Sequence, residues 1–110
     1  MTPEETKLRA ASMQNKPIQC KNKGRPGYWN VGVVVDEVFV IVSDYKHMIQ
    51  KIRRPEGQGG DGNLFAYRIG YYTLAAQKKN VKWGQYTSIL AESEFRKLLQ
   101  QAKQKGWEIF

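Results

Sequence analysis

The chain has 110 residues, a length typical of one domain, and 18 Lys and Arg against 10 Asp and Glu give it a formal net charge of +8. Its 41% hydrophobic and 25% charged residues place it among globular proteins, and no apolar run reaches the ~18–20 residues of a membrane helix. Because it has one Cys, one His and no apolar N-terminal signal, we expect a cytoplasmic protein without a disulfide, a structural zinc or a cofactor.

The N-terminus predicts a short helix. Thr2 is suited to cap it, Pro3 fits the first turn, and Glu5 occupies the capping-box position. We expect residues 1–16 to form this helix or a flexible arm, ahead of a single β-rich domain over residues 17–110.

The first half of that domain has strand-like composition. Ile18–Cys20 predicts a short strand, and the β-branched and aromatic runs Tyr28–Val35 and Val38–Val42 predict a hairpin that turns at Asp36-Glu37. Residues 45–52 fit both helical spacing and strand alternation. Arg53–Asn63, with four glycines and a proline, predicts a loop that is mobile or ordered by a ligand.

The second half predicts two long strands and a helix. The strands are Leu64–Leu74 and Val81–Leu90, and we expect Gly70 to lie opposite Gly84. The helix is amphipathic over Glu92–Lys105, and its apolar stripe comprises Phe95, Leu98, Leu99 and Ala102. The predicted class is α+β, with a strongly bent antiparallel sheet or small barrel and a C-terminal amphipathic helix.

The stretch GYWNVGVVVDEVFVIVSDYKHMIQKIR resembles the small SH3-like barrels, and the Tudor pattern in particular. The resemblance covers about a third of the chain and rests on Tyr28-Trp29, Gly32, Val34 and the strand ending Asp44-Tyr45. It implies an SH3-like barrel, with Trp29 and Tyr45 at or near an aromatic pocket. Lys46 stands where the Tudor pattern prefers Gly, and no acidic residue is identified that would complete a methyl-lysine or methyl-arginine cage.

In the expected register, one face of the second hairpin carries Arg68, Tyr72, Lys82 and Tyr86. Bases could stack on the tyrosines while the cations neutralise phosphates. The alternative for two opposed glycines is structural, because bare backbone in a sheet often marks the close approach of a helix or a neighbouring aromatic ring.

Three enzymatic patterns do not fit the sequence. Nothing brings Cys20, Asp44 and His47 together as a catalytic triad. Asp36 and Asp44 resemble a nuclease pair, but eight strand residues would separate them by about 25 Å. The glycine loop lacks the Lys-Ser/Thr ending of a phosphate-binding loop. We therefore expect a protein that is not an enzyme.

Basic residues are segregated from acidic ones: residues 16–25 and 46–54 each carry four cations and no acid. This predicts a module that binds nucleic acid, DNA or RNA, through a basic and aromatic sheet face. The alternative is a protein-interaction module, an inhibitor or adaptor that binds an acidic partner surface; no membrane contact is expected. The predicted nucleic-acid-binding residues are Lys23, Arg25, Arg53, Arg54, Arg68, Tyr72, Lys82 and Tyr86.

Overall fold

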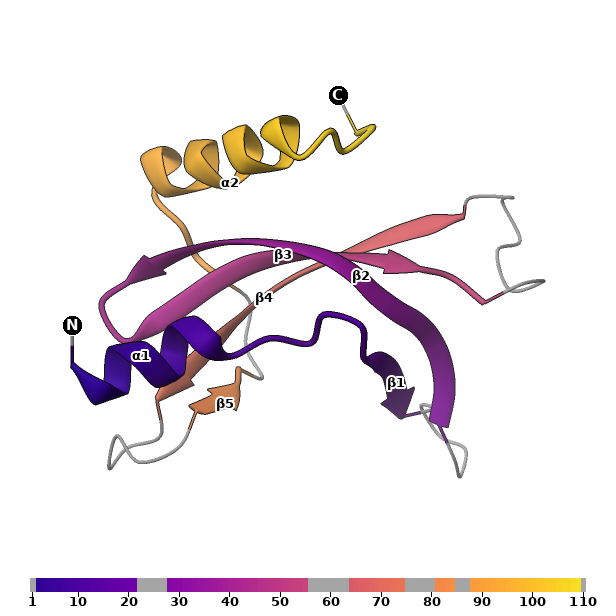
Figure 1. Cartoon of the computed structure of the whole chain (residues 1–110), viewed down its shortest axis with the longest axis horizontal. Helices are drawn as coiled ribbons and strands as arrows, with labels where there is room; N and C mark the ends of the chain where they lie inside the picture. Colours follow the sequence, from indigo (N-terminus) through magenta and orange to yellow (C-terminus); the bar gives the residue numbers. More distant parts are fainter. Residues whose placement is uncertain (1, 22–27, 56–63, 75–80, 85–87, 110) are drawn as a thin grey trace. The chain divides into compact units, whose positions relative to one another are not determined.

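The computed structural model describes residues 2–21, 28–55, 64–74, 81–84 and 88–109, with backbone only at 19–21 and 28–30. Its elements are, in chain order, α1 (Pro3–Ala10), β1 (Pro17–Lys21), β2 (Tyr28–Val42), β3 (Tyr45–Arg53), β4 (Phe65–Leu74), β5 (Val81–Trp83) and α2 (Glu92–Gln104) (Figure 1). The strands form one strongly curved antiparallel sheet in the order β1-β2-β3-β4-β5. The predicted α+β class with a C-terminal helix is confirmed. None of the described helices is long and apolar enough to cross a membrane.

The chain divides into two compact units, each built from segments that are separated in the sequence. The first unit consists of Met1–Ala11, Val38–Ile49 and Ile69–Phe110, and the second of Ser12–Glu37 and Gln50–Arg68. Strands β2, β3 and β4 therefore contribute residues to both units, and each unit has buried residues of its own.

In the first unit, α1 starts as the sequence predicts. The Thr2 side chain accepts a hydrogen bond from the backbone N–H of Glu5 at 3.1 Å, and Leu8 is buried. At the other end of the helix, the buried Lys46 ammonium donates to the carbonyl oxygens of Arg9 and Ala11 at 2.6 and 2.5 Å. A cation at this end also opposes the partial negative charge of the helix C-terminus.

Helix α2 belongs to the first unit and packs within it through apolar and polar contacts. Leu98 and Ala102 are buried, and the Gln101 amide both donates to the carbonyl oxygen of Phe39 and accepts from its N–H. The helix ends at Gln104, one residue before the predicted end. Gly106 then adopts a φ of 76° that lets the chain fold back, and Trp107 is buried. Phe95, predicted to lie in the buried stripe, is exposed.

The core of the second unit is small. Ile18, Val34 and Ile52 are buried together, with Met13, Val31 and Ala66 packed around them. Gly32 is required in β2, because its φ is 138° and an added Cβ would lie 2.1 Å from the carbonyl oxygen of Arg53.

The predicted hairpin at Asp36-Glu37 is wrong, since β2 runs without a break through both residues. The chain turns instead at Ser43-Asp44, where Ser43 has a φ of 55°. Glu37 looks like a turn residue in the sequence but is buried, and its carboxylate accepts from Ser12 Oγ, the Met13 N–H and Gln50 Nε2. The segment 45–52, which fitted two patterns, is strand β3.

The predicted register of the last hairpin is also wrong, by one residue. Tyr72 lies opposite Trp83 and Thr73 opposite Lys82, so Gly70 and Gly84 do not face each other. Strand β5 ends at Trp83 and does not extend to Leu90.

An aromatic ring covers each of these glycines, as the structural alternative predicted. A Cβ added to Gly70 would lie 2.2 Å from the Trp83 ring, and one added to Gly84 would lie 2.0 Å from the Tyr71 ring. The shifted register is the one that brings both rings over bare backbone.

This packing predicts the effect of Gly70→Ala. The added methyl group collides with the Trp83 ring, so we expect the variant to lose about 1–3 kcal/mol of unfolding free energy in urea titrations. In a Trp83→Leu background the penalty of Gly70→Ala should fall to less than about half. An equal penalty in both backgrounds would contradict the observed register.

Candidate functional site

The predicted site residues fall into three groups. Lys23, Arg25 and Tyr86 lie outside the described residues, and only the backbone of Trp29 is described, in β2. Of the other six, Arg53, Arg54 and Arg68 lie in the second unit, and Tyr45, Tyr72 and Lys82 lie in the first.

The stacking surface predicted on the second hairpin is not present at Tyr72. Its side chain is only 8% exposed, and its ring packs edge-on against Trp83 with 5.0 Å between centroids. Lys82 is exposed, but it lies opposite Thr73 and therefore on the other face of the hairpin from Tyr72. The one-residue shift in register is the cause, because it exchanges the faces of all β5 side chains relative to β4.

Arg68 belongs to a polar network of the second unit. Its Nε donates to Gln50 Oε1 at 2.7 Å, and Gln50 Nε2 donates to Glu37 Oε2 at the same distance. Gln50 is fully buried and Glu37 nearly so. Arg68 therefore donates to a buried amide, a structural role that the sequence did not predict.

The other face of β3 and β4 in this unit combines cations with rings. The Arg54 N–H donates to the Leu64 carbonyl oxygen at 2.9 Å, which sets the pairing of the two strands. Counting from it places Arg53 opposite Phe65 and Lys51 opposite Tyr67. We call these four residues the outer face: Lys51, Arg53, Phe65 and Tyr67.

The outer face is accessible to solvent. Arg53 is exposed, and Lys51, Phe65 and Tyr67 are each half-buried. Lys51 Nζ lies 4.3 Å from the centroid of the Phe65 ring, within the range of a cation–π contact. Ile52 and Gln50, which alternate with these residues along β3, are buried.

The first unit contains an aromatic pocket of about 420 Å³, lined by Val42, Ser43, Tyr45, His47, Tyr71 and Ile89. The Tyr45 ring lies nearly parallel to the His47 ring at 5.9 Å and meets Tyr71 edge-on at 5.5 Å. Tyr45, which the SH3-like resemblance places at a pocket, is 43% exposed at its rim.

His47 lines this pocket and has a buried polar atom. The residue is only 7% exposed, and its Nδ1 has no hydrogen-bond partner in the described part of the chain. Burial lowers the pKa of His47 below 6.5, and the carboxylate of Glu94 opposes this effect in part. The imidazole is therefore neutral at pH 7.

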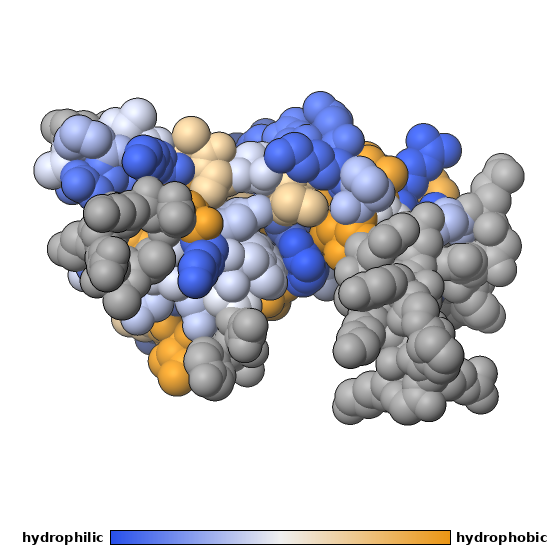
Figure 2. All heavy atoms as spheres, turned by 90° about the horizontal axis from the view of Figure 1, so that it is seen from below, coloured by the Kyte–Doolittle hydropathy of each residue, from blue (hydrophilic) through white to orange (hydrophobic). Residues whose placement is uncertain are grey.

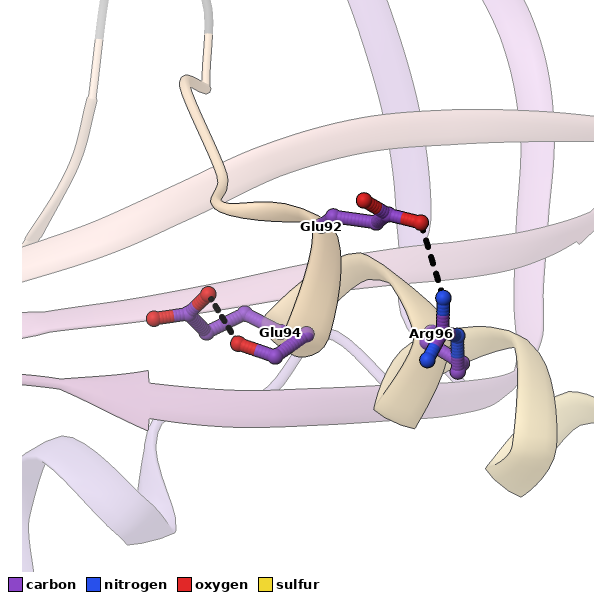
Figure 3. Close-up of polar contacts among 4 residues, drawn as sticks. Glu92, Glu94 and Arg96 are labelled. Carbon is purple, nitrogen blue, oxygen red and sulfur yellow. Dashed lines mark hydrogen bonds and ion pairs between the residues drawn. The ribbon is translucent and has the colours of Figure 1, made fainter.

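Figure 3 shows the polar contacts at the start of α2, where Glu94 lies. Its carboxylate accepts a hydrogen bond from Ser93 Oγ at 3.1 Å, and Glu92 pairs with Arg96 at 2.8 Å. Both contacts are local to the helix and exposed, so they contribute little to stability. Their relevance is that Glu94 is the acidic group whose charge acts on His47.

Lys46 has a structural role in the first unit. Lys46 is buried, binds the end of α1 and lies 4.2 Å from the centroid of the Phe39 ring. Within the described ranges, no group of three or more His, Cys, Asp or Glu residues is placed to hold a metal ion.

Sequence reasoning missed three residues of the outer face, Lys51, Phe65 and Tyr67, and five of the pocket, Val42, Ser43, His47, Tyr71 and Ile89. Alternation along β4 groups Phe65, Tyr67 and Tyr71 correctly, but their apolar character suggested a core face. The signal that could have separated them is the alternation of Lys51 and Arg53 with the apolar residues of β3.

Comparison with known proteins does not identify this chain: no family model, curated protein or solved structure matches it. The curved five-stranded antiparallel sheet is compatible with a small SH3-like barrel.

Arg68 and Arg53, both in the second unit, predict different effects of substitution. Arg68→Ala removes the donor to the buried Gln50 amide, so we expect a loss of about 1–3 kcal/mol in unfolding free energy. Arg53→Ala removes an exposed side chain and should change it by less than about 0.5 kcal/mol. Urea unfolding of both variants measures this, and equal losses would argue against the network.

His47 predicts a pH dependence of stability. Since its folded pKa is lowered, the unfolded chain binds a proton that the folded chain resists, and the unfolding free energy should fall as the pH drops from 7.5 to 5.5. His47→Phe should remove most of this slope, because carboxylates titrate mainly at lower pH. Urea titrations at the two pH values test it, and an identical slope in both proteins would rule out His47 as its source.

Proposed function

We propose that this protein is a non-enzymatic module that binds nucleic acid, and that the outer face of β3 and β4 is its contact surface. The observation that carries the proposal is the placement of Lys51 and Arg53 beside the partly buried side chains of Phe65 and Tyr67. Ammonium and guanidinium groups attract phosphates, while flat rings accept bases by stacking, and single-strand binders combine these two elements.

The net charge of the chain also supports a nucleic-acid partner. The whole chain carries a net charge of +8, which attracts a polyanion before any specific contact forms. Figure 2 shows one side of the molecule, where hydrophilic residues occupy much of the coloured surface and hydrophobic residues form small separate areas. The residues coloured in that view form no broad apolar surface of the kind typical of an obligate protein interface.

Other predicted residues keep their proposed roles within this function. Arg54, at the end of β3, and the exposed Lys82 are proposed phosphate contacts, and so are Lys23 and Arg25. Tyr86 is a proposed stacking residue. The finer resemblance, a Tudor-like SH3 barrel with Trp29 at an aromatic pocket, belongs to this proposal as well.

An acidic protein partner is the alternative that the same cations would serve. A nucleic acid would stack its bases on the rings of Phe65 and Tyr67, whereas the carboxylates of an acidic protein need no flat stacking surface. Replacing the rings without changing the charge therefore separates them. Phe65→Leu/Tyr67→Leu should weaken binding to an oligonucleotide and leave binding to poly-glutamate unchanged.

The cations of the outer face predict a salt effect on oligonucleotide binding. We expect Lys51→Gln/Arg53→Gln to weaken binding to single-stranded DNA and to reduce the slope of log K against log salt by about 1.4, at roughly 0.7 per lost phosphate contact. Fluorescence anisotropy between 50 and 300 mM salt measures both quantities.

The matched control is Lys97→Gln/Lys103→Gln, which removes the same charge from exposed positions on α2. It should reduce affinity only slightly and leave the slope nearly intact. If the two double variants behave alike, net charge and not the outer face determines binding.

A further inference from the structure

We infer that Lys51 controls the access of bases to the Phe65 ring, so that this ring favours bases that arrive together with a phosphate. The inference rests on the proposed function and deepens it. It makes Lys51 a specificity-determining residue of the outer face, which selects nucleotide units over uncharged aromatic groups.

The Lys51 ammonium occupies one face of the Phe65 ring. Arg53 lies directly opposite Phe65, and Lys51 lies on the diagonal, a position from which a long side chain reaches a neighbouring ring. Lys51 Nζ lies 4.3 Å from the ring centroid. Stacked rings have centroids about 4.5–7 Å apart, so a base that stacks on this face takes the place of the ammonium.

Displacement of the ammonium by an uncharged ring weakens stacking, because the Phe65 ring loses its cation–π contact when it gains the base. A phosphate changes this balance. It attracts the ammonium and offers charged hydrogen-bond acceptors that the ring lacks. A ligand that carries a phosphate next to its base therefore draws Lys51 off the ring and stacks in its place.

Anions without a flat ring do not require this exchange. An ammonium group has three N–H donors, so a carboxylate or a bare phosphate can bind Lys51 from its solvent side while the side chain stays over Phe65. The exchange is complete only with a ligand that supplies both groups. This combination is present in every unit of a nucleic-acid strand.

The position of Lys51 can be measured by NMR of the full chain. The ring current of Phe65 shifts the Lys51 ε-protons upfield, and these signals are assigned by their absence from Lys51→Gln. We expect single-stranded oligothymidine to remove the upfield shift, and an abasic strand with the same number of phosphates to leave most of it in place. An equal response to the two strands would contradict the inference.

A ligand without phosphate predicts a reversal of sign. Peptide nucleic acid with an acetylated amino terminus carries thymine bases on an uncharged backbone. Lys51→Gln uncovers the Phe65 ring, so it should bind this analogue about twofold to fivefold more tightly than the unmodified protein, although it binds oligothymidine more weakly. Fluorescence anisotropy with labelled strands measures both, and an unchanged or reduced affinity for the analogue would overturn the inference.

The matched control is Arg53→Gln, which removes the same charge from the same face and leaves the contact between Lys51 and Phe65 in place. It should weaken binding to oligothymidine and leave binding to the uncharged analogue unchanged. A gain of equal size in both variants would show that charge alone opposes the analogue, and would also overturn the inference.

These outcomes are separate from the failure of the proposed function. If the outer face is not the contact surface, Lys51→Gln/Arg53→Gln behaves like the α2 control toward DNA. If the outer face binds DNA but the Lys51 signals and the analogue do not respond as stated, only the role of Lys51 is wrong.

Discussion

Two aromatic rings that rest on glycines set the faces of the hairpin formed by β4 and β5. Trp83 covers Gly70 and Tyr71 covers Gly84, and neither contact leaves room for a side chain at the glycine. Since a sheet has a side-chain period of two, these contacts decide which residues share a face. They bury Tyr72 against Trp83 and position Tyr71 in the aromatic pocket. The candidate sites of the first unit follow from this choice of register.

Polar networks have a comparable role in the interior. In the second unit, the Glu37 carboxylate and the Gln50 amide satisfy each other and also bind Ser12, Met13 and Arg68. In the first unit, Lys46 satisfies carbonyl groups at the end of α1. Buried polar groups of this kind are costly unless every partner is present, so they specify one arrangement of the chain. His47 differs from them because its Nδ1 lacks such a partner in the described residues.

Some cations of this chain bind acceptors within the fold, whereas others face solvent and can bind a ligand. Arg68 and Lys46 look like surface cations in the sequence, yet their charged groups bind acceptors within their own unit. Lys51 and Arg53 lie on the opposite side of β3 from the buried Gln50 and Ile52, where solvent reaches them. Net charge alone does not make this distinction. The face of the strand on which each cation lies does.

The sequence alone determined the elements whose signals are local. Thr2 and Pro3 start α1, Gly106 lets the chain fold back after α2, and β-branched residues identify most of the strands. These signals are local because capping and backbone preferences act within a few residues. Only the tertiary structure decided that β2 continues through Glu37 and that β4 and β5 pair in the observed register. It also decided which residues are buried: Tyr72, Lys46, and Gln50, the partner of Arg68. Each of these depends on groups far apart in the chain: a carboxylate finds its donors, or a ring finds a glycine, only after the strands have paired. Local preference cannot contain that information, because the partner is chosen by packing.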